Sequence, residues 1–267
     1  MDYKVVDKIN ISKDCRKIGQ FLYDEKNDGL YFDGPWPFKV QIGITHSLTR
    51  CEVTPGFLKL PFILRGWINM DILLREIELM ELVRSDRLLL HASCVDNDLI
   101  VGFPNSGKTY QTFKSVAAGG RLISEEYTVI EAGQACPFRP MTRSCFSKKT
   151  LEACGMKLSL KERAHLAFTT ARAALMPFMF EAVIWKNIPV SGWKSKVKRI
   201  MYGSTGEELK DYKKLIILTE NEFPFMANDF LQAYALCSGL DLISTQERQR
   251  HLIKEFVHAV YFNSVSQ

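Results

Sequence analysis

The sequence has no closely spaced pair of cysteines, and this absence excludes several kinds of site. The cysteine count is odd and no C-x-x-C pair occurs, which argues against a disulfide framework and against a zinc or redox motif. The seven positions are Cys15, Cys51, Cys94, Cys136, Cys145, Cys154 and Cys237. We therefore expect mostly buried, reduced thiols and a reducing, cytoplasmic compartment.

A signal peptide and a membrane-spanning run are also missing. The chain begins with Met-Asp-Tyr-Lys, which alternates charged and apolar residues instead of opening an apolar signal core. The longest apolar stretch, residues 164–180, is interrupted by Arg172 and is too short to cross a bilayer. We therefore expect a soluble chain with no membrane partner.

A strong excess of charge of one sign is absent as well. The 35 Lys and Arg residues and the 30 Asp and Glu residues give a formal net charge of +5. This value suits a protein that handles phosphates or acidic substrates, but it is too small to indicate a nucleic-acid partner. The hydrophobic content of 46% is ordinary for a globular protein, and 267 residues allow one large domain or two modest ones.

The first part of the chain reads as β-rich. Aromatic and β-branched runs at 29–33 and 38–42 flank the turn-forming Gly34-Pro35-Trp36-Pro37, which predicts a small antiparallel meander. A helix is expected from about residue 71 to 83. We therefore predict a β-rich N-terminal domain over 1–84 that carries no assignable motif. Its segment 29–44 is a candidate edge for substrate recognition by β-augmentation.

The remaining residues, 85–267, alternate apolar strands with helical segments. We expect one buried strand over 87–95, a tight turn at 96–98 and a second strand over 99–101, which together form a hairpin. A helix over 109–118 should end at Gly119-Gly120, and a strand over 121–124 follows. This strand, loop, helix and strand succession predicts a βαβ unit with a parallel pair.

Two further elements are expected downstream in the same domain. Residues 213–218 predict another buried strand, and the tail from about 227 to 261 should be mostly helical.

A glycine-rich loop connects the strand over 99–101 to the helix that follows. Residues 102–109 satisfy the spacing G-x-x-x-x-G-K-[ST], in which Gly102 and Gly107 let successive N–H groups point at an anion. Lys108 can reach the β- and γ-phosphates, and Thr109 can offer its hydroxyl to Mg²⁺. The alternative is a chance match on a structural loop. We predict a nucleoside triphosphate site that includes Asn105 and Ser106.

Phosphoryl transfer also needs a carboxylate near the terminal phosphate. Glu125 and Glu126 follow the strand that we expect beside the loop's own strand, and strand alternation would let only one of them face the phosphates. The alternative is a solvated turn. His91 lies within an apolar strand, where a satisfied core histidine is the usual explanation and a catalytic role is the other.

These segments together resemble the HPr kinase/phosphorylase superfamily, and more closely the HPr-kinase-related serine kinases of bacterial biosynthetic gene clusters. The similarity rests on the strand ending in His91, the loop 102–109 and the segment from Gly120 to Glu126. Residues 136–140 are similar to the proline-rich segment that comes next in these kinases. The tail 227–234 is weakly similar to their C-terminal helical region.

The resemblance implies an α/β fold with a P-loop core of the HPr kinase-like and PEP carboxykinase-like kind, a β-rich N-terminal domain and a C-terminal helical region. It implies transfer of the ATP γ-phosphate to a hydroxyl, usually of serine, on a peptide such as a precursor peptide, a protein or a small metabolite. One member of the Glu125–Glu126 pair would be the base, Thr109 and Glu126 would hold Mg²⁺, and His91 would lie near the transferred phosphate. Members often form oligomers, so a homo-oligomer is implied.

The sequence departs from this family at two points. The acidic pair is mostly Asp-Asp or Asp-Glu in the family, whereas both positions here are Glu. The glycine-rich signature of true HPr kinases is absent, so HPr is not the expected substrate. A nucleotide-binding regulatory module without turnover and a P-loop ATPase are therefore the alternative functions.

Two groups of basic residues are candidates for contacts with phosphates or substrate. Arg139 and Arg143 follow the acidic pair, and residues 191–199 form a dense basic run with Trp193. A cation from this run could stabilise charge in the transition state. The alternative for each is a solvated surface residue.

Overall fold

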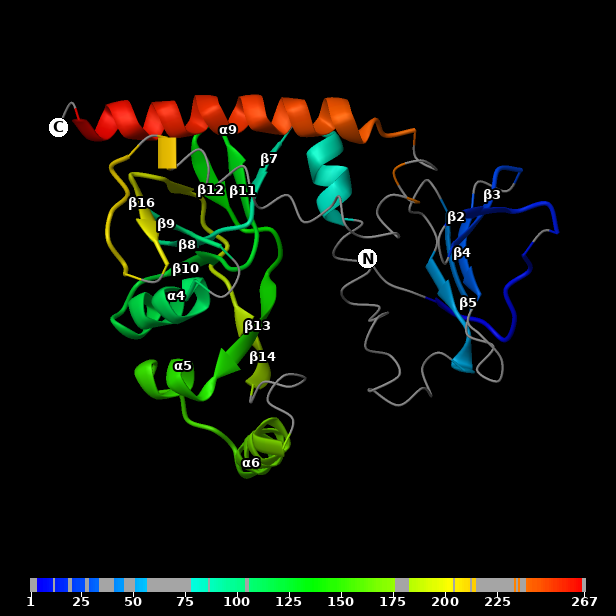
Figure 1. Ribbon diagram of the computed structural model, residues 1–267, viewed down its shortest axis with the longest axis horizontal. Helices are drawn as coiled ribbons and strands as arrows, with labels where there is room; N and C mark the ends of the chain where they lie inside the picture. The colour runs from blue at the N-terminus through cyan, green and yellow to red at the C-terminus, as the bar shows by residue number, and fades with distance from the viewer. Residues whose placement is uncertain are drawn as a thin grey trace. The chain divides into compact units, whose positions relative to one another are not determined.

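The computed structural model (Figure 1) is α/β, with helices and several separate sheets. It describes residues 4–11, 13–18, 21–26, 29–33, 41–45, 51–56, 78–85, 87–103, 106–175, 183–203, 205–211, 213–214, 233, 235 and 239–265. None of the helices in these ranges combines the length and hydrophobicity that a bilayer-spanning helix needs.

The chain divides into two compact units. The first comprises residues 1–86 and 223–248, and the second comprises residues 87–222 and 249–267. Each unit is therefore built from two segments that are separated in the sequence.

The first unit contains a six-stranded sheet in the order β1-β6-β5-β4-β3-β2. Its strands are β1 (Lys4–Val5), β2 (Arg16–Ile18), β3 (Phe21–Asp24), β4 (Gly29–Asp33), β5 (Gln41–Thr45) and β6 (Cys51–Val53). The strands from β2 to β6 pair antiparallel in chain order, which confirms the predicted meander, and β1 pairs parallel with β6. Of the helix predicted over 71–83, the described residues 78–84 are helical, with Leu79, Met80 and Val83 buried.

The second unit is built around a four-stranded sheet in the order β10-β8-β9-β16. Its strands are β8 (Ser93–Val95), β9 (Asp98–Val101), β10 (Leu122–Ser124) and β16 (Arg199–Tyr202). The predicted hairpin is confirmed, since β8 and β9 pair antiparallel across the turn at 96–97. The prediction that β10 lies directly beside β9 is wrong, because β10 bonds to β8 rather than to β9. The strands β9 and β10 run in the same direction with β8 between them, and the parallel neighbour of β9 is β16.

The single strand predicted over 87–95 is also wrong. It divides into β7 (Leu88–Leu90) and β8, which belong to different sheets. The first of these joins a sheet in the order β15-β12-β11-β7, whose other strands are β11 (Thr128–Glu131), β12 (Gln134–Cys136) and β15 (Ser195–Lys196). Strand structure is interrupted at His91–Ala92, where the carbonyl of Ala92 accepts a hydrogen bond from Thr128 Oγ1 at 2.7 Å. A buried side chain on a neighbouring element thus satisfies the backbone group that leaves the ladder.

Helix α4 (Lys108–Ala117) follows the glycine-rich loop, as predicted. It ends in the expected glycine cap: Gly120 N donates to Ser115 O and Gly119 N donates to Val116 O, with Gly119 at φ +101°. This pair of bonds is a Schellman motif, in which the left-handed residue is normally glycine. Phe113 of this helix packs against Phe146 with 4.6 Å between ring centroids and a tilt of 53° between the rings, within a core cluster that also contains Val95 and Ile100.

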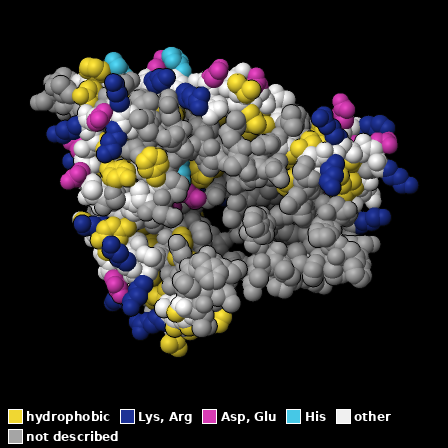
Figure 2. All heavy atoms as spheres, viewed as in Figure 1, with side chains coloured by type: hydrophobic (Ala, Val, Ile, Leu, Met, Phe, Trp, Pro, Cys, Tyr) yellow, Lys and Arg dark blue, Asp and Glu magenta, His cyan; other side chains and the backbone are white. Residues whose placement is uncertain are grey.

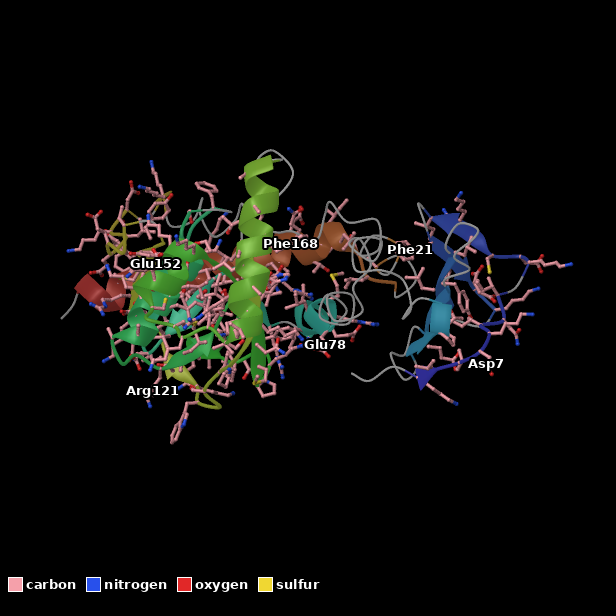
Figure 3. The ribbon with its side chains drawn as sticks, turned by 90° about the horizontal axis from the view of Figure 1, so that it is seen from below. Asp7, Phe21, Glu78, Arg121, Glu152 and Phe168 are labelled. Carbon is pink, nitrogen blue, oxygen red and sulfur yellow. The ribbon has the colours of Figure 1, made fainter. Side chains whose placement is uncertain are left out.

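An antiparallel pair of strands, with two helices between them in the sequence, lies beside this core. The elements are β13 (Met141–Ser147), α5 (Lys148–Ala153), α6 (Leu160–Leu175) and β14 (Val183–Pro189). Helix α6 begins with a capping box: Glu162 N donates to Ser159 Oγ, and Ser159 N donates to Glu162 Oε2 at 2.8 Å. The bonds from Ser159 and then the contact with Lys186 lower the pKa of Glu162 to about 2. Phe168 on the same helix is 64% exposed (Figure 3).

Most of the described part of the predicted helical tail is helical, and it ends in α9 (Leu242–Val265), whereas residues 239–241 are not helical. Gln249 is completely buried and ties this helix to the start of β7. Its Oε1 accepts from Leu89 N at 3.1 Å, and its Nε2 donates to Arg87 O at 2.7 Å. The strand predicted over 213–218 lies largely outside the described residues.

Candidate functional site

The glycine-rich loop joins the end of β9 to the start of α4. Gly102 has φ +153°, and a Cβ on it would lie 2.3 Å from Ser106 Oγ, so the loop closes tightly only with glycine here. Gly107, at φ +86°, is the N-cap residue of α4 and supplies no side-chain cap. The first turn of the helix contains no acidic residue. The N–H groups of this turn therefore point out of the helix without a capping side chain, as an anion site requires. Asn105 lies outside the described residues.

Two polar side chains of the loop are buried in a way that suits a bound anion. Lys108 is 9% exposed, and its Nζ donates to the carbonyl of Gly102 within the loop itself. Ser106 Oγ is buried and has no hydrogen-bond partner among the described residues. A buried hydroxyl without a partner is costly. A phosphate oxygen would satisfy it and would attract the ammonium group of Lys108.

Glu125 lies at the centre of a cluster of hydroxyl groups. Its Oε2 accepts from Ser144 Oγ at 2.8 Å and from Thr142 Oγ1 at 3.2 Å, and its Oε1 accepts from Thr109 Oγ1 at 3.3 Å. Burial raises the pKa of Glu125, the charge of Glu126 raises it further, and the three hydroxyl bonds lower it. The contact between Thr109 and Glu125 joins the predicted loop to the predicted acidic pair.

Glu126 adopts a backbone conformation that is rare for a residue with a side chain. Its φ is +68°, and Tyr127 N donates across it to Glu125 O at 2.9 Å, which closes a three-residue γ-turn. Such a conformation costs on the order of 1–3 kcal/mol and persists where the surroundings enforce it, often at functional sites. Strand geometry ends at Ser124. The alternation of side-chain direction expected for Glu125 and Glu126 therefore does not apply. The γ-turn determines the directions of the two side chains instead.

His91 lies at the break between β7 and β8 and is half-buried. Its ring stacks on Tyr127 with 5.4 Å between the centroids and 29° between the planes. Ser124 and Thr128, on either side of the γ-turn, share a 2.6 Å hydrogen bond, and Thr128 in turn bonds to Ala92. The break that carries His91 and the turn that carries Glu126 are thus held together by buried contacts.

The strand β16 supplies a neighbour for the loop that sequence reasoning missed. Gly203 follows this strand, and its N donates to Val101 O at 2.9 Å. A Cβ on Gly203 would lie 2.8 Å from Lys108 N and 2.9 Å from Lys108 Cα. Only glycine allows the two backbones to approach so closely. A strand that ends in glycine is the sequence signal that could have indicated this contact.

The two hydroxyls of β13 were also missed. Thr142 and Ser144 are two residues apart, so strand periodicity places them on the same face of β13. This spacing of polar residues was visible in the sequence, but the pairing of β13 with the acidic turn was not. Arg143 lies between them, and its side chain falls outside the described residues. Arg139 packs over Phe138 at 5.4 Å from the ring centroid.

The last two residues of the basic run over 191–199 lie at the end of β9 that is away from the loop. Lys198 N and Arg199 N both donate to Asn97 O, which precedes β9, whereas the loop follows β9. At about 3.3 Å per residue, a four-residue strand separates the two by roughly 13 Å. Arg199 also pairs with Asp98 through two bonds of 2.8 and 2.7 Å. Figure 2 shows Lys and Arg side chains scattered over the visible face rather than gathered in one patch.

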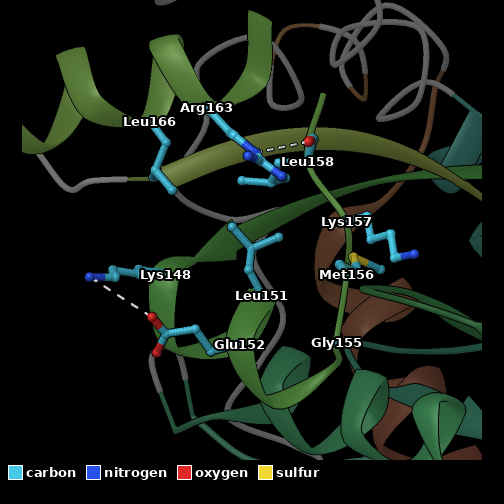
Figure 4. Close-up of a pocket in the computed structure, with 9 residues that line it drawn as sticks. All are labelled: Lys148, Leu151, Glu152, Gly155, Met156, Lys157, Leu158, Arg163 and Leu166. Carbon is cyan, nitrogen blue, oxygen red and sulfur yellow. Dashed lines mark hydrogen bonds and ion pairs between the residues drawn. The ribbon is translucent and has the colours of Figure 1, made fainter. Parts of the chain in front are cut away.

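A cavity of about 360 Å³ lies between residues of α5 and α6 (Figure 4). Its wall combines apolar side chains such as Leu151 and Leu166 with charged ones such as Arg163, which donates to Leu158 O. None of the predicted site residues lines it. The cavity is therefore separate from the loop and the acidic pair.

A comparison of the sequence with models of known protein families and with curated proteins finds no match.

Proposed function

We propose that the chain is an ATP-dependent kinase with a P-loop core of the HPr kinase-like kind, which transfers the γ-phosphate to a hydroxyl group. The observation that carries the proposal is the 3.3 Å hydrogen bond from Thr109 to Glu125. It brings a phosphate-binding type of loop within reach of a carboxylate 16 positions away in the sequence, which is the pairing that phosphoryl transfer needs.

The loop supplies the binding groups in this proposal. The first N–H groups of α4 and the hydroxyl of Ser106 bind phosphate oxygens, and Lys108 moves from the carbonyl of Gly102 to the β- and γ-phosphates. Thr109 and an acidic side chain hold Mg²⁺, an ion that is usually bound by one or two protein groups together with substrate phosphates. When bound, Mg²⁺ neutralises charge that develops on the phosphate oxygens.

The two glutamates have different roles. Glu125 has both oxygens engaged by hydroxyls and is buried, so it positions Thr109. Glu126 is half-buried and is presented by the γ-turn, so it is the better group to take the proton from the attacking hydroxyl and to lie near the metal. His91 stacks on Tyr127, the last residue of this turn, and is the group proposed to contact the transferred phosphate.

The acceptor is the least defined part of the proposal. We propose a serine hydroxyl of a peptide, of a protein or of a small metabolite, in a cytoplasmic bacterial biosynthetic pathway. The edge predicted at 29–44 is wrong, because β4 and β5 are each paired on both sides within the six-stranded sheet. Among the described strands, β1 and β2 lie at the edges of this sheet and are the candidates for holding a peptide by strand addition.

The test is a reaction with Mg²⁺ and ATP, run with and without candidate hydroxyl substrates, in which the release of ADP is measured. Lys108→Ala should abolish transfer, whereas Lys114→Ala, an exposed lysine of the same helix, should leave it unchanged. Glu126→Gln should lower kcat by about 100-fold or more, in line with the loss of a general base.

Three other outcomes would contradict the proposal. ADP release that does not depend on substrate would indicate an ATPase. Tight nucleotide binding without any ADP would indicate a regulatory module. Wild-type rates in Glu126→Gln would exclude this residue as the base.

A further inference from the structure

Tyr202 lies beside the start of the glycine-rich loop. It is the last residue of β16, and it is in register with Val101, the residue before the loop. Its ring carbon Cε2 lies 3.3 Å from the position that a Cβ on Gly102 would occupy. The ring is half-buried, so one part of it packs against the loop and another part faces outward.

The segment after Tyr202 forms a closed turn. Gly206 N donates to Tyr202 O at 2.8 Å, and Tyr202 N donates to Glu207 O at 2.9 Å. The turn contacts the first turn of α4 at two glycines: Gly203 abuts the backbone of Lys108, and a Cβ on Gly206 would lie 2.7 Å from Gln111 Nε2. Backbone hydrogen bonds and close packing thus form this wall of the loop in advance, as a small-molecule site requires.

The position of the acidic turn determines on which side of the loop this wall lies. In the sheet order β10-β8-β9-β16, Glu125 follows the strand at one edge, and Tyr202 ends the strand at the other edge. If the terminal phosphate faces the carboxylates, as proposed above, the rest of the nucleotide leaves the loop toward β16. Tyr202 then presents its ring on this side of the loop.

One face of the Tyr202 ring already has a cationic partner, which a stacked base would displace. Lys214 Nζ lies 5.5 Å from its centroid, a cation–π distance. The same kind of face stacks nucleobases, and because every base has a π-face, such stacking is tolerant of base identity.

We propose that Tyr202 is the stacking platform for the base of the bound nucleoside triphosphate, with Gly203 and Gly206 in one wall of this subsite. The inference rests on the proposed function, since it assigns the nucleoside end of the same ligand. It gives a role to the tyrosine that ends β16 and to the two glycines, Gly203 and Gly206, that come after it.

The test separates the two ends of the ligand by measuring, calorimetrically and with Mg²⁺, the binding of ATP and of inorganic tripolyphosphate. Tyr202→Leu keeps an apolar side chain but removes the ring, and it should weaken ATP binding about tenfold. Its affinity for tripolyphosphate should stay within twofold of the wild type. Tyr202→Phe, which keeps the ring, should bind both ligands as the wild type does.

Three results would overturn the inference. If Tyr202→Leu weakens both ligands equally, the residue acts on the loop through Gly102 and not on the base. If the variant changes neither ligand, or if the wild type binds ATP no better than tripolyphosphate, there is no stacking platform at Tyr202. Failure of the wild type to bind either ligand would instead refute the proposed function, and the inference with it.

Discussion

Replacing Gly203 with alanine tests the contact between the β16 turn and the glycine-rich loop. The added Cβ would lie 2.8 Å from Lys108 N, 2.9 Å from Lys108 Cα and 3.0 Å from Lys108 Cγ. The two nearest atoms belong to the backbone at the start of α4, so they cannot rotate away as a side chain would. Overpacking of this kind typically costs about 1–3 kcal/mol.

The magnitude can be measured as thermal stability and as binding. Each kcal/mol lowers the melting temperature by roughly 2–4 °C in a domain of 150–250 residues, so Gly203→Ala should melt roughly 2–12 °C below the wild type. The displaced helix start should also bind tripolyphosphate more weakly, because the N–H groups that face the anion move with it.

Gly192→Ala is the matched control, since a Cβ there would have no atom within 4 Å. It should be neutral or slightly stabilising, because alanine restricts the unfolded chain more than glycine does. The reasoning would be refuted if the two variants had the same melting temperature and the same affinity for tripolyphosphate. In that case the close approach of the two backbones would have no energetic consequence.

Two further predictions concern buried polar groups. Burial raises the pKa of Glu125 above its ordinary value of 4.5, and the charge of Glu126 adds to this. The folded chain therefore holds this proton more tightly than the unfolded chain, and the resulting stability is present below pH 4.5 and is lost as the pH rises through the raised pKa. As the pH rises from about 4 to neutrality, Glu125→Gln should thus lose less stability than the wild type. The free energy of unfolding would be measured with urea at a series of pH values, and the same pH dependence in both proteins would contradict this. Gln249→Leu leaves Leu89 N–H and Arg87 C=O without their buried partner and should cost about 2–4 kcal/mol in urea unfolding, whereas a change below about 0.5 kcal/mol would show that these groups find other partners.

The parts of the second unit that could be predicted from the sequence are those determined by contiguous residues. The hairpin of β8 and β9 depends on a short polar turn between apolar runs, and the glycine cap of α4 depends on Gly119-Gly120. The loop 102–109 was predicted from the positions of its glycines and of Lys108. In each case the hydrogen bonds that define the element join residues a few positions apart.

The parts that could not be predicted depend on partners far away in the chain. The break at His91 is invisible locally because both halves of the segment 88–95 are apolar, and only the choice of sheet separates them. The position of β8 between β9 and β10 likewise depends on which strands pair, and local sequence does not determine this. The hydroxyls of Thr142 and Ser144 reach Glu125 only because β13 packs beside the acidic turn.

The pairing of β9 with β16 has a consequence for how the chain is made. Arg199 and Asp98, which pair at one end of these strands, are 101 positions apart. At about 5–20 residues per second, a ribosome needs roughly 5–20 s to synthesise the residues between them. During this interval the loop 102–109 exists with β8 and β9 but without the glycine wall at 203. The loop is therefore synthesised well before Gly203, which packs against it in the folded chain. A chain truncated before Gly203 would present the loop sequence without the wall that encloses it.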